Sequence, residues 1–197
     1  MEEVNIKRKM NHFFKIKEII KEIGFWECGY VRVDKLRYSQ EVRRICEENT
    51  CQNYAASWAC PPAIGTLLEC KSRVEQYGKM LLFTKKYEVE DSFDFQGMMN
   101  GRVDFQKKVD VLQKKLNHIL PEYLLLSNEG CERCAECTYP DAPCRFPQFL
   151  HHSLEGYGLI VGELAREAGV CYYNGPNTVT YFGALLFEKI NKSTENT

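Results

Sequence analysis

Residues 122–147 read EYLLLSNEGCERCAECTYPDAPCRFP, in which a short apolar run leads directly into cysteines at positions 131, 134, 137 and 144. The segment at 122–127 has the length and the leucine content of a short buried strand. The stretch therefore predicts a sheet strand that continues, without an intervening helix, into a cysteine-rich loop. The four thiols of that loop are the strongest indication of function in the sequence.

The segments on either side of this stretch alternate between helical and strand periodicity. Pro121 ends one helical pattern, and Thr66 and Glu69 have the spacing of a capping box. The expected helices lie at 11–23, 39–49, 66–77, 105–119 and about 159–168, and the expected strands at 25–33, 79–89 and 122–127, with two more around an NGPN turn within 170–190. This order predicts a mixed α/β or α+β fold.

We expect a single metal-binding domain over residues 1–197, with a mixed sheet, flanking helices and a cysteine-rich metal-binding loop region. No internal repeat or linker indicates a second domain. The ends at 1–10 and 191–197 are expected to be frayed, because charged and polar termini have little to pack against.

The composition excludes several classes of protein. The chain has 197 residues, 44% of them hydrophobic, and a formal net charge of -1 without a cluster of lysines. A nucleic-acid-binding or polybasic membrane protein would show a basic patch. No apolar run approaches the roughly 18 residues of a membrane span, and the charged N-terminus is unlike a secretory signal. We therefore expect a cytoplasmic protein with neither a nucleic-acid nor a membrane partner.

Ten cysteines in a cytoplasmic protein are not expected to form disulfides, because that compartment keeps thiols reduced. Metal or redox chemistry is then the leading interpretation of the clustered cysteines. The scattered Cys28, Cys46, Cys70 and Cys171 need no role beyond that of small buried apolar side chains.

Cys131, Cys134 and Cys137 form a C-x2-C-x2-C motif. The thiolates of a four-iron cluster each bind a different iron, so they lie farther apart than the four ligands of one zinc ion. Bacterial ferredoxins use this spacing, whereas zinc sites usually combine two separate C-x2-C hairpins. The motif therefore predicts a [4Fe-4S] cluster, with zinc as the alternative metal.

The spacing leaves two candidates for the fourth ligand. Cys144 follows in the same loop, while a Cys-Pro pair of the ferredoxin kind occurs far upstream at Cys60, with Cys51 before it. Thiols beyond the four that one cluster needs would either surround it or belong to a second metal centre. Two clusters with four cysteines each would have to recruit the scattered cysteines, which we do not expect.

Other side chains near these cysteines carry weaker signals. Trp58 and Tyr54 flank the Cys60 loop and are candidates to shield a cluster from water, although ordinary loop packing explains them equally well. Arg145 and Glu155 are candidates to handle a substrate if the cluster has an open iron position. The catalytic residues, if there are any, stay unknown at this level.

Four blocks of the sequence resemble the family of predicted metal-binding proteins called domain of unknown function 2284. The blocks are VRRICEENTCQNYAASWACPPAIGTLLEC, GCERCAECTYPDAPCRFP, SLEGYGLIV and NTVTYFGALLF, which extend from about residue 40 to residue 187. Ala55 stands where the family typically has glycine. The resemblance implies metal binding through Cys51, Cys60, Cys131, Cys134, Cys137 and Cys144.

The resemblance implies no reaction, so three hypotheses about function remain. In the first, the cluster passes electrons to a redox partner protein or serves a larger system as a redox accessory. In the second, zinc holds the same cysteines together in a non-redox binding protein. In the third, the chain is an enzyme whose iron–sulfur cluster has an open position for substrate.

Overall fold

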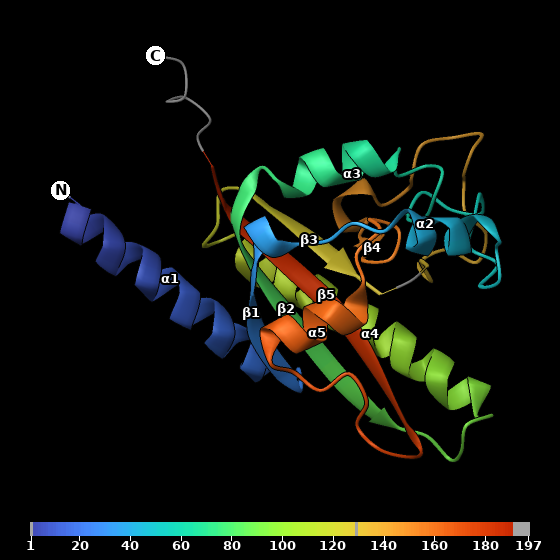
Figure 1. The fold of residues 1–197 in the computed structure, drawn as a ribbon. Coiled ribbons are helices and arrows are strands. Elements are labelled where there is room, and N and C mark those ends of the chain that lie inside the picture. The colour runs from blue at the N-terminus through green and yellow to red at the C-terminus, as the bar shows by residue number, and fades with distance from the viewer. Residues whose placement is uncertain (1, 129, 191–197) are drawn as a thin grey trace.

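The structure is a computed structural model that describes residues 2–128 and 130–190, with side chains from residue 12 onward. The described residues form one five-stranded sheet in the order β1-β2-β5-β3-β4 (Figure 1). All neighbouring strands are antiparallel except β3 and β4, which are parallel. The strands are β1 (Glu27–Arg32), β2 (Tyr77–Glu88), β3 (Tyr123–Ser127), β4 (His152–Ser153) and β5 (Thr178–Lys189). The expected mixed sheet is confirmed.

Helices cover both faces of this sheet (Figure 1). Helices α1 and α4 pack with Leu81 and Phe83 of β2, whereas α3 and α5 pack with Met80 and Leu82 on the opposite face. Because both faces are buried, the middle of β2 and the middle of β5 are continuous apolar runs instead of alternating with polar residues. The α-helices are α1 (Glu2–Ile23), α2 (Gln40–Glu47), α3 (Leu67–Val74), α4 (Phe95–Leu116) and α5 (Val161–Ala168), with short 3-10 helices at Val33–Lys35 and Pro147–Phe149.

Two predicted helix starts are confirmed by their hydrogen bonds. The backbone N–H of Glu69 donates to the Thr66 hydroxyl at 3.2 Å, and the backbone N–H of Thr66 donates to the Glu69 carboxylate at 2.7 Å. Ser39 accepts a bond from the Val42 N–H at 3.2 Å and so begins α2. Both caps are local in sequence, which is why the spacing alone predicts them.

The two longest helices begin earlier than the apolar periodicity predicts. Helix α4 begins at Phe95, where Asp94 accepts a hydrogen bond from the Gly97 N–H at 2.8 Å. Helix α1 begins at Glu2 instead of residue 11. The expected fraying at residue 1 and at residues 191–197 lies outside the described residues. None of the helices in the described part of the chain is both long and apolar enough to cross a membrane.

The expected hairpin within residues 170–190 is wrong. Residues 178–189 form β5, but residues 170–177 form no strand. Both edges of β5 are already paired, with β2 on one side and β3 on the other, so the preceding segment has no edge to join.

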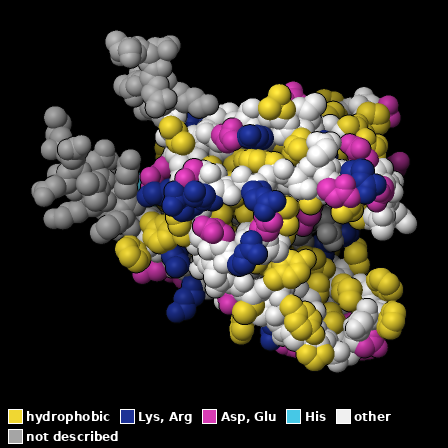
Figure 2. Space-filling model, viewed as in Figure 1, with side chains coloured by type: hydrophobic (Ala, Val, Ile, Leu, Met, Phe, Trp, Pro, Cys, Tyr) yellow, Lys and Arg dark blue, Asp and Glu magenta, His cyan; other side chains and the backbone are white. Residues whose placement is uncertain are grey.

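Tyr172 and Tyr173 of this segment are exposed, as are Phe93 and Phe95 beyond the end of β2. Hydrophobic side chains gather over this end of the molecule (Figure 2).

Candidate metal centre

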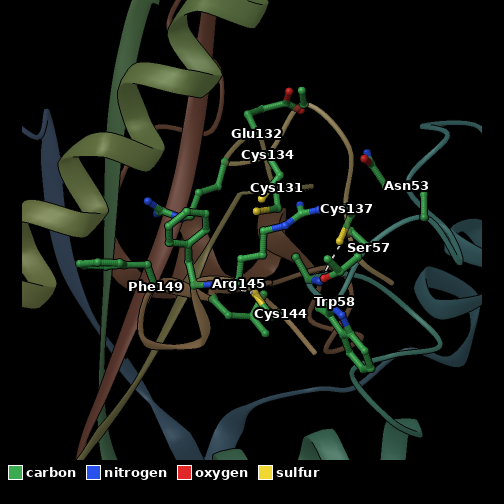
Figure 3. A pocket seen from close by; sticks show the side chains of 17 residues that line it. Asn53, Ser57, Trp58, Cys131, Glu132, Cys134, Cys137, Cys144, Arg145 and Phe149 are labelled. Atoms are coloured by element: carbon green, nitrogen blue, oxygen red, sulfur yellow. Dashed lines mark hydrogen bonds between the residues drawn. The ribbon is translucent and has the colours of Figure 1, made fainter. Parts of the chain in front are cut away.

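The four cysteines at 131, 134, 137 and 144 line one cavity of about 200 Å³, here called the four-cysteine cavity. Their run lies between β3 and β4, and Asn53 and residues 56–59 of the upstream loop form another part of the wall. The four side chains surround a common space, and Arg145 reaches in among them (Figure 3). Two loops therefore build this site, but all of its thiols come from one of them.

Trp58 connects the upstream loop to the cysteine run. Its indole Nε1 donates to the backbone oxygen of Ala142 at 3.0 Å. Its ring meets that of Tyr139 edge-on, with centroids 4.9 Å apart. Trp58 lines the four-cysteine cavity, whereas Tyr54 lines a different one. Of the two aromatic residues expected to shield a cluster from water, only Trp58 lies beside the four cysteines.

One face of α4 holds the cysteine run in place. Arg102 forms an ion pair with Glu132. Gln106 accepts a hydrogen bond from the Glu132 N–H at 3.2 Å. Asp110 accepts two bonds from the guanidinium of Arg133, both at 2.7 Å. Because residues four apart lie on the same face of a helix, these three α4 side chains form one polar row along the cysteine run.

The periodicity of this segment predicts the apolar face of the helix but assigns no role to the polar row. Arg102, Gln106, Asp110 and Gln113 recur at spacings of three and four, which is a visible signal. A polar row on an amphipathic helix usually faces solvent, however, so the sequence offers no reason to assign it a partner. Its partners become identifiable only once the fold is known.

Thiols must lose their protons to bind a metal, and a positive charge and amide donors lie beside this run. Burial raises the pKa of Cys131, while a backbone hydrogen bond from Arg133 and the positive charge of Arg133 oppose that rise. The backbone N–H of Phe146 donates to the Cys144 sulfur at 3.4 Å. The guanidinium of Arg133 packs over the ring of Phe149, at 4.9 Å from the ring centroid. The charge and the backbone N–H of Arg133 therefore offset part of the effect of burial on Cys131.

Cys51 and Cys60 do not line the four-cysteine cavity. Together with Cys46 they line a second cavity of about 490 Å³, here called the three-cysteine cavity. Cys46 is half-buried in α2, Cys51 is exposed and Cys60 is buried. Cys46, which the sequence treats only as a small buried apolar side chain, thus lies beside the two upstream cysteines. The six cysteines implied by the family resemblance divide into a group of four and a group of two, and Cys46 joins the latter.

The two cavities adjoin each other. Asn53 lines both of them. Burial raises the pKa of Cys60 to about 11, and hydrogen bonds from the backbone of Gly130 and the side chain of Ser57 oppose that rise. The sulfur of Cys60 therefore touches the residue directly before Cys131. Cys60 lies close to the cysteine run but faces the other cavity.

The thiols line the two cavities and do not converge on the position of a single metal ion. Within residues 12–128 and 130–190, no three His, Cys, Asp or Glu side chains lie close enough together to hold a single metal ion. His151 pairs through Nε2 with the Gln113 amide at 3.1 Å, and His152 pairs through Nδ1 with the Tyr157 hydroxyl at 3.1 Å. Both imidazoles therefore bind other side chains, and neither lines one of the two cavities.

Seven thiols grouped around two cavities on a mixed α/β scaffold define a cysteine-rich metal-binding protein. The chain belongs to the family described as predicted metal-binding protein (DUF2284), whose model matches residues 30–187. The match covers both cavities and confirms metal binding as the property that the family shares. It specifies neither the metal nor a reaction.

Among solved structures, the chain is similar to epoxyqueuosine reductase from Bacillus subtilis, with 12% sequence identity and a TM-score of 0.39. The alignment covers 93% of this chain and 49% of that one, so the chain spans about half the length of the reductase. A similarity this low supports no conclusion about activity or metal. No curated protein matches the chain.

Replacing Asp110 by alanine is expected to loosen the cysteine run. The half-buried guanidinium of Arg133 would lose both of its carboxylate bonds, at a cost of about 1–3 kcal/mol in the free energy of unfolding. Urea unfolding and the rate at which a thiol reagent modifies Cys131 measure the effect. Asp104→Ala on the same helix is the matched control, because Asp104 accepts from the Tyr87 hydroxyl and not from the run. Equal thiol reactivity in both variants would contradict the role of the polar row.

Lowering the pH from about 6.5 to about 4 is expected to destabilise the fold. Burial lowers the pKa of both His151 and His152 to about 4. Between that value and the ordinary imidazole pKa, the unfolded chain binds more protons, so this stability is present above pH 6.5 and lost as the pH falls. The loss amounts to a few kcal/mol in total.

The measurement compares unfolding free energies of the wild type and a His151→Gln, His152→Gln double variant across this pH range. The difference between them isolates the two imidazoles from other groups that titrate. His118→Gln, at an exposed position, should follow the wild type. A double variant with an unchanged slope would refute the assignment.

Proposed function

We propose that the chain carries a [4Fe-4S] cluster on Cys131, Cys134, Cys137 and Cys144 and transfers electrons to a partner protein. The observation that carries the proposal is that these four thiols, which begin with C-x2-C-x2-C, line a single cavity. When bound there, such a cluster would accept and release one electron at a time. Cys144 is preferred to Cys60 as the fourth ligand because Cys60 lines the other cavity.

The size of the cavity favours a cluster over a single zinc ion. Zinc in a structural site is enclosed by four ligands, with Zn–S bonds of about 2.3 Å, and leaves no space between them. A water molecule occupies about 30 Å³ in the liquid. The four-cysteine cavity, at about 200 Å³, has room for a cofactor of several atoms.

The surrounding residues fit a negatively charged cofactor. Arg133 is held by Asp110, and Arg145 donates to the backbone oxygen of Glu136 at 2.8 Å while it lines the cavity. These two guanidinium groups would offset the negative charge of four thiolates. Backbone N–H donors to ligand sulfurs raise the reduction potential of a cluster. Such donors already reach Cys131 and Cys144.

One side of the cysteine run is accessible to a partner protein. Residues 141–143 and 145–148 are exposed, and Cys144 between them is half-buried. An electron-transfer partner needs to approach the cofactor without displacing its ligands. The exposed segment beside Cys144 would allow this approach, while Trp58 and Phe149 wall the cavity on other sides.

Anaerobic purification followed by metal analysis tests the proposal. The expected protein is brown, contains iron and acid-labile sulfide, and has visible absorption that dithionite bleaches. The reduced form should give an EPR signal that is lost in Cys131→Ser. A colourless protein with stoichiometric zinc would overturn the proposal and favour a structural, non-redox role.

A further inference from the structure

The three-cysteine cavity brings together thiols from two separate segments. Cys46 comes from the last turn of α2, and Cys51 and Cys60 come from the irregular segment that follows. Burial raises the pKa of Cys46 and of Cys60, and in each case the charge of Cys51 adds to the rise. The three sulfurs are therefore near enough to influence one another, and all three border the same space.

A buried positive charge lies next to these thiols. Arg43 is 6% exposed. Its guanidinium donates to the backbone oxygens of Gly156, at 2.5 Å, and of Gly65. Carbonyl oxygens satisfy its N–H groups but do not neutralise its charge, and a buried charge is costly unless an opposite charge is close. The guanidinium also lies 3.9 Å from the Cys70 sulfur, and its charge acts on Cys46 as well. An anionic cluster bound by Cys46 would supply the opposite charge.

The walls of the cavity are mostly apolar, with one carboxylate. Glu155 lines it beside the thiols and interacts with Cys46 through its charge. The apolar part of the wall is formed by Val42, Ile45, Tyr54, Leu159, Val161 and Tyr172. Apolar surroundings around a few convergent polar groups are characteristic of sites that bind a small ligand.

We infer that the three-cysteine cavity holds a second four-iron cluster, bound by Cys46, Cys51 and Cys60, with its fourth iron accessible from the cavity beside Glu155. Thiolates are the preferred ligands of iron–sulfur clusters, whereas carboxylates suit harder metal ions, so Glu155 is an exchangeable fourth ligand. A small molecule that enters the cavity would displace it. This inference does not depend on the cluster proposed for the four-cysteine cavity.

Iron analysis of the full-length, anaerobically prepared protein tests the inference. The wild type should contain about eight iron per chain, and Cys46→Ser about four. Cys171→Ser is the matched control, because Cys171 is exposed and lines neither cavity. Wild-type iron near four per chain, with no loss in Cys46→Ser, would overturn the inference.

Failure of this inference can be distinguished from failure of the proposed function. Cys131→Ser should remove the iron of the four-cysteine cavity and retain that of the three-cysteine cavity. If Cys131→Ser removes all iron while Cys46→Ser removes none, the second cluster is refuted and the first stands. If Cys46→Ser alone removes iron, the first is refuted and the second stands.

A second variant keeps the test decisive if Cys46→Ser does not fold. Cyanide, as a small probe ligand, should shift an EPR signal of the reduced wild type by binding the accessible iron. Glu155→Cys should retain the iron but abolish the shift, because a fourth thiolate would close the position. The shift should persist in Cys144→Ser. A wild-type signal that cyanide leaves unchanged would refute the open position.

Discussion

Replacing Cys144 by serine is expected to abolish the EPR signal of the proposed cluster, whereas Cys60→Ser should retain that signal. Cys144 lines the same cavity as Cys131, Cys134 and Cys137, and Cys60 faces the neighbouring one. The loss should amount to about four iron per chain. The reference is the EPR signal of the dithionite-reduced protein that disappears in Cys131→Ser. Iron bound elsewhere in the chain therefore does not affect the comparison.

The reverse result would be equally informative. If Cys144→Ser keeps the reference signal and Cys60→Ser loses it, the fourth ligand comes from the upstream loop. The Cys60 sulfur already touches Gly130, so such a change would need only a rearrangement between adjoining segments. Cys171→Ser should leave both the signal and the iron content unchanged, since this exposed thiol borders neither cavity.

The parts of the fold that sequence predicts best are those fixed by neighbouring residues. The capping box at Thr66 and Glu69 and the short strand at 122–127 depend only on local spacing and are confirmed. The hairpin at the C-terminal end fails because strand pairing is not local. NGPN is a good turn signal, but β2 and β3 already occupy both edges of β5.

The candidate site divides in the same way. The spacing of Cys131, Cys134 and Cys137 predicts that they act together, and the structure places them around one cavity with Cys144. Nothing in the periodicity relates Cys46 to the Cys51–Cys60 loop, because a cysteine in a helix is usually an apolar packing residue. Only the packing of α2 against that loop brings the three thiols together.

Replacing Gly130 by alanine is expected to impair metal binding in both cavities. Gly130 has a φ of 69°, which costs a residue with a side chain about 1–2 kcal/mol. An added Cβ would also lie 2.9 Å from the Asn53 amide oxygen. Because Asn53 lines both cavities, its displacement would alter both walls. The backbone of Gly130 also hydrogen-bonds the Cys60 sulfur, so its movement would affect the second group of thiols directly.

The expected result for Gly130→Ala is a folded protein with substantially reduced iron content and both EPR signals weakened. Gly169→Ala is the matched control, because Gly169 has nearly the same φ, 67°, but nothing lies within 4 Å of a Cβ at that position and it lines neither cavity. The two variants should differ far more in iron content than in unfolding free energy, since the strain at Gly130 is confined to the segment between the cavities. Wild-type iron content in Gly130→Ala would show that this segment adapts without cost, and that the two cavities are not coupled through it.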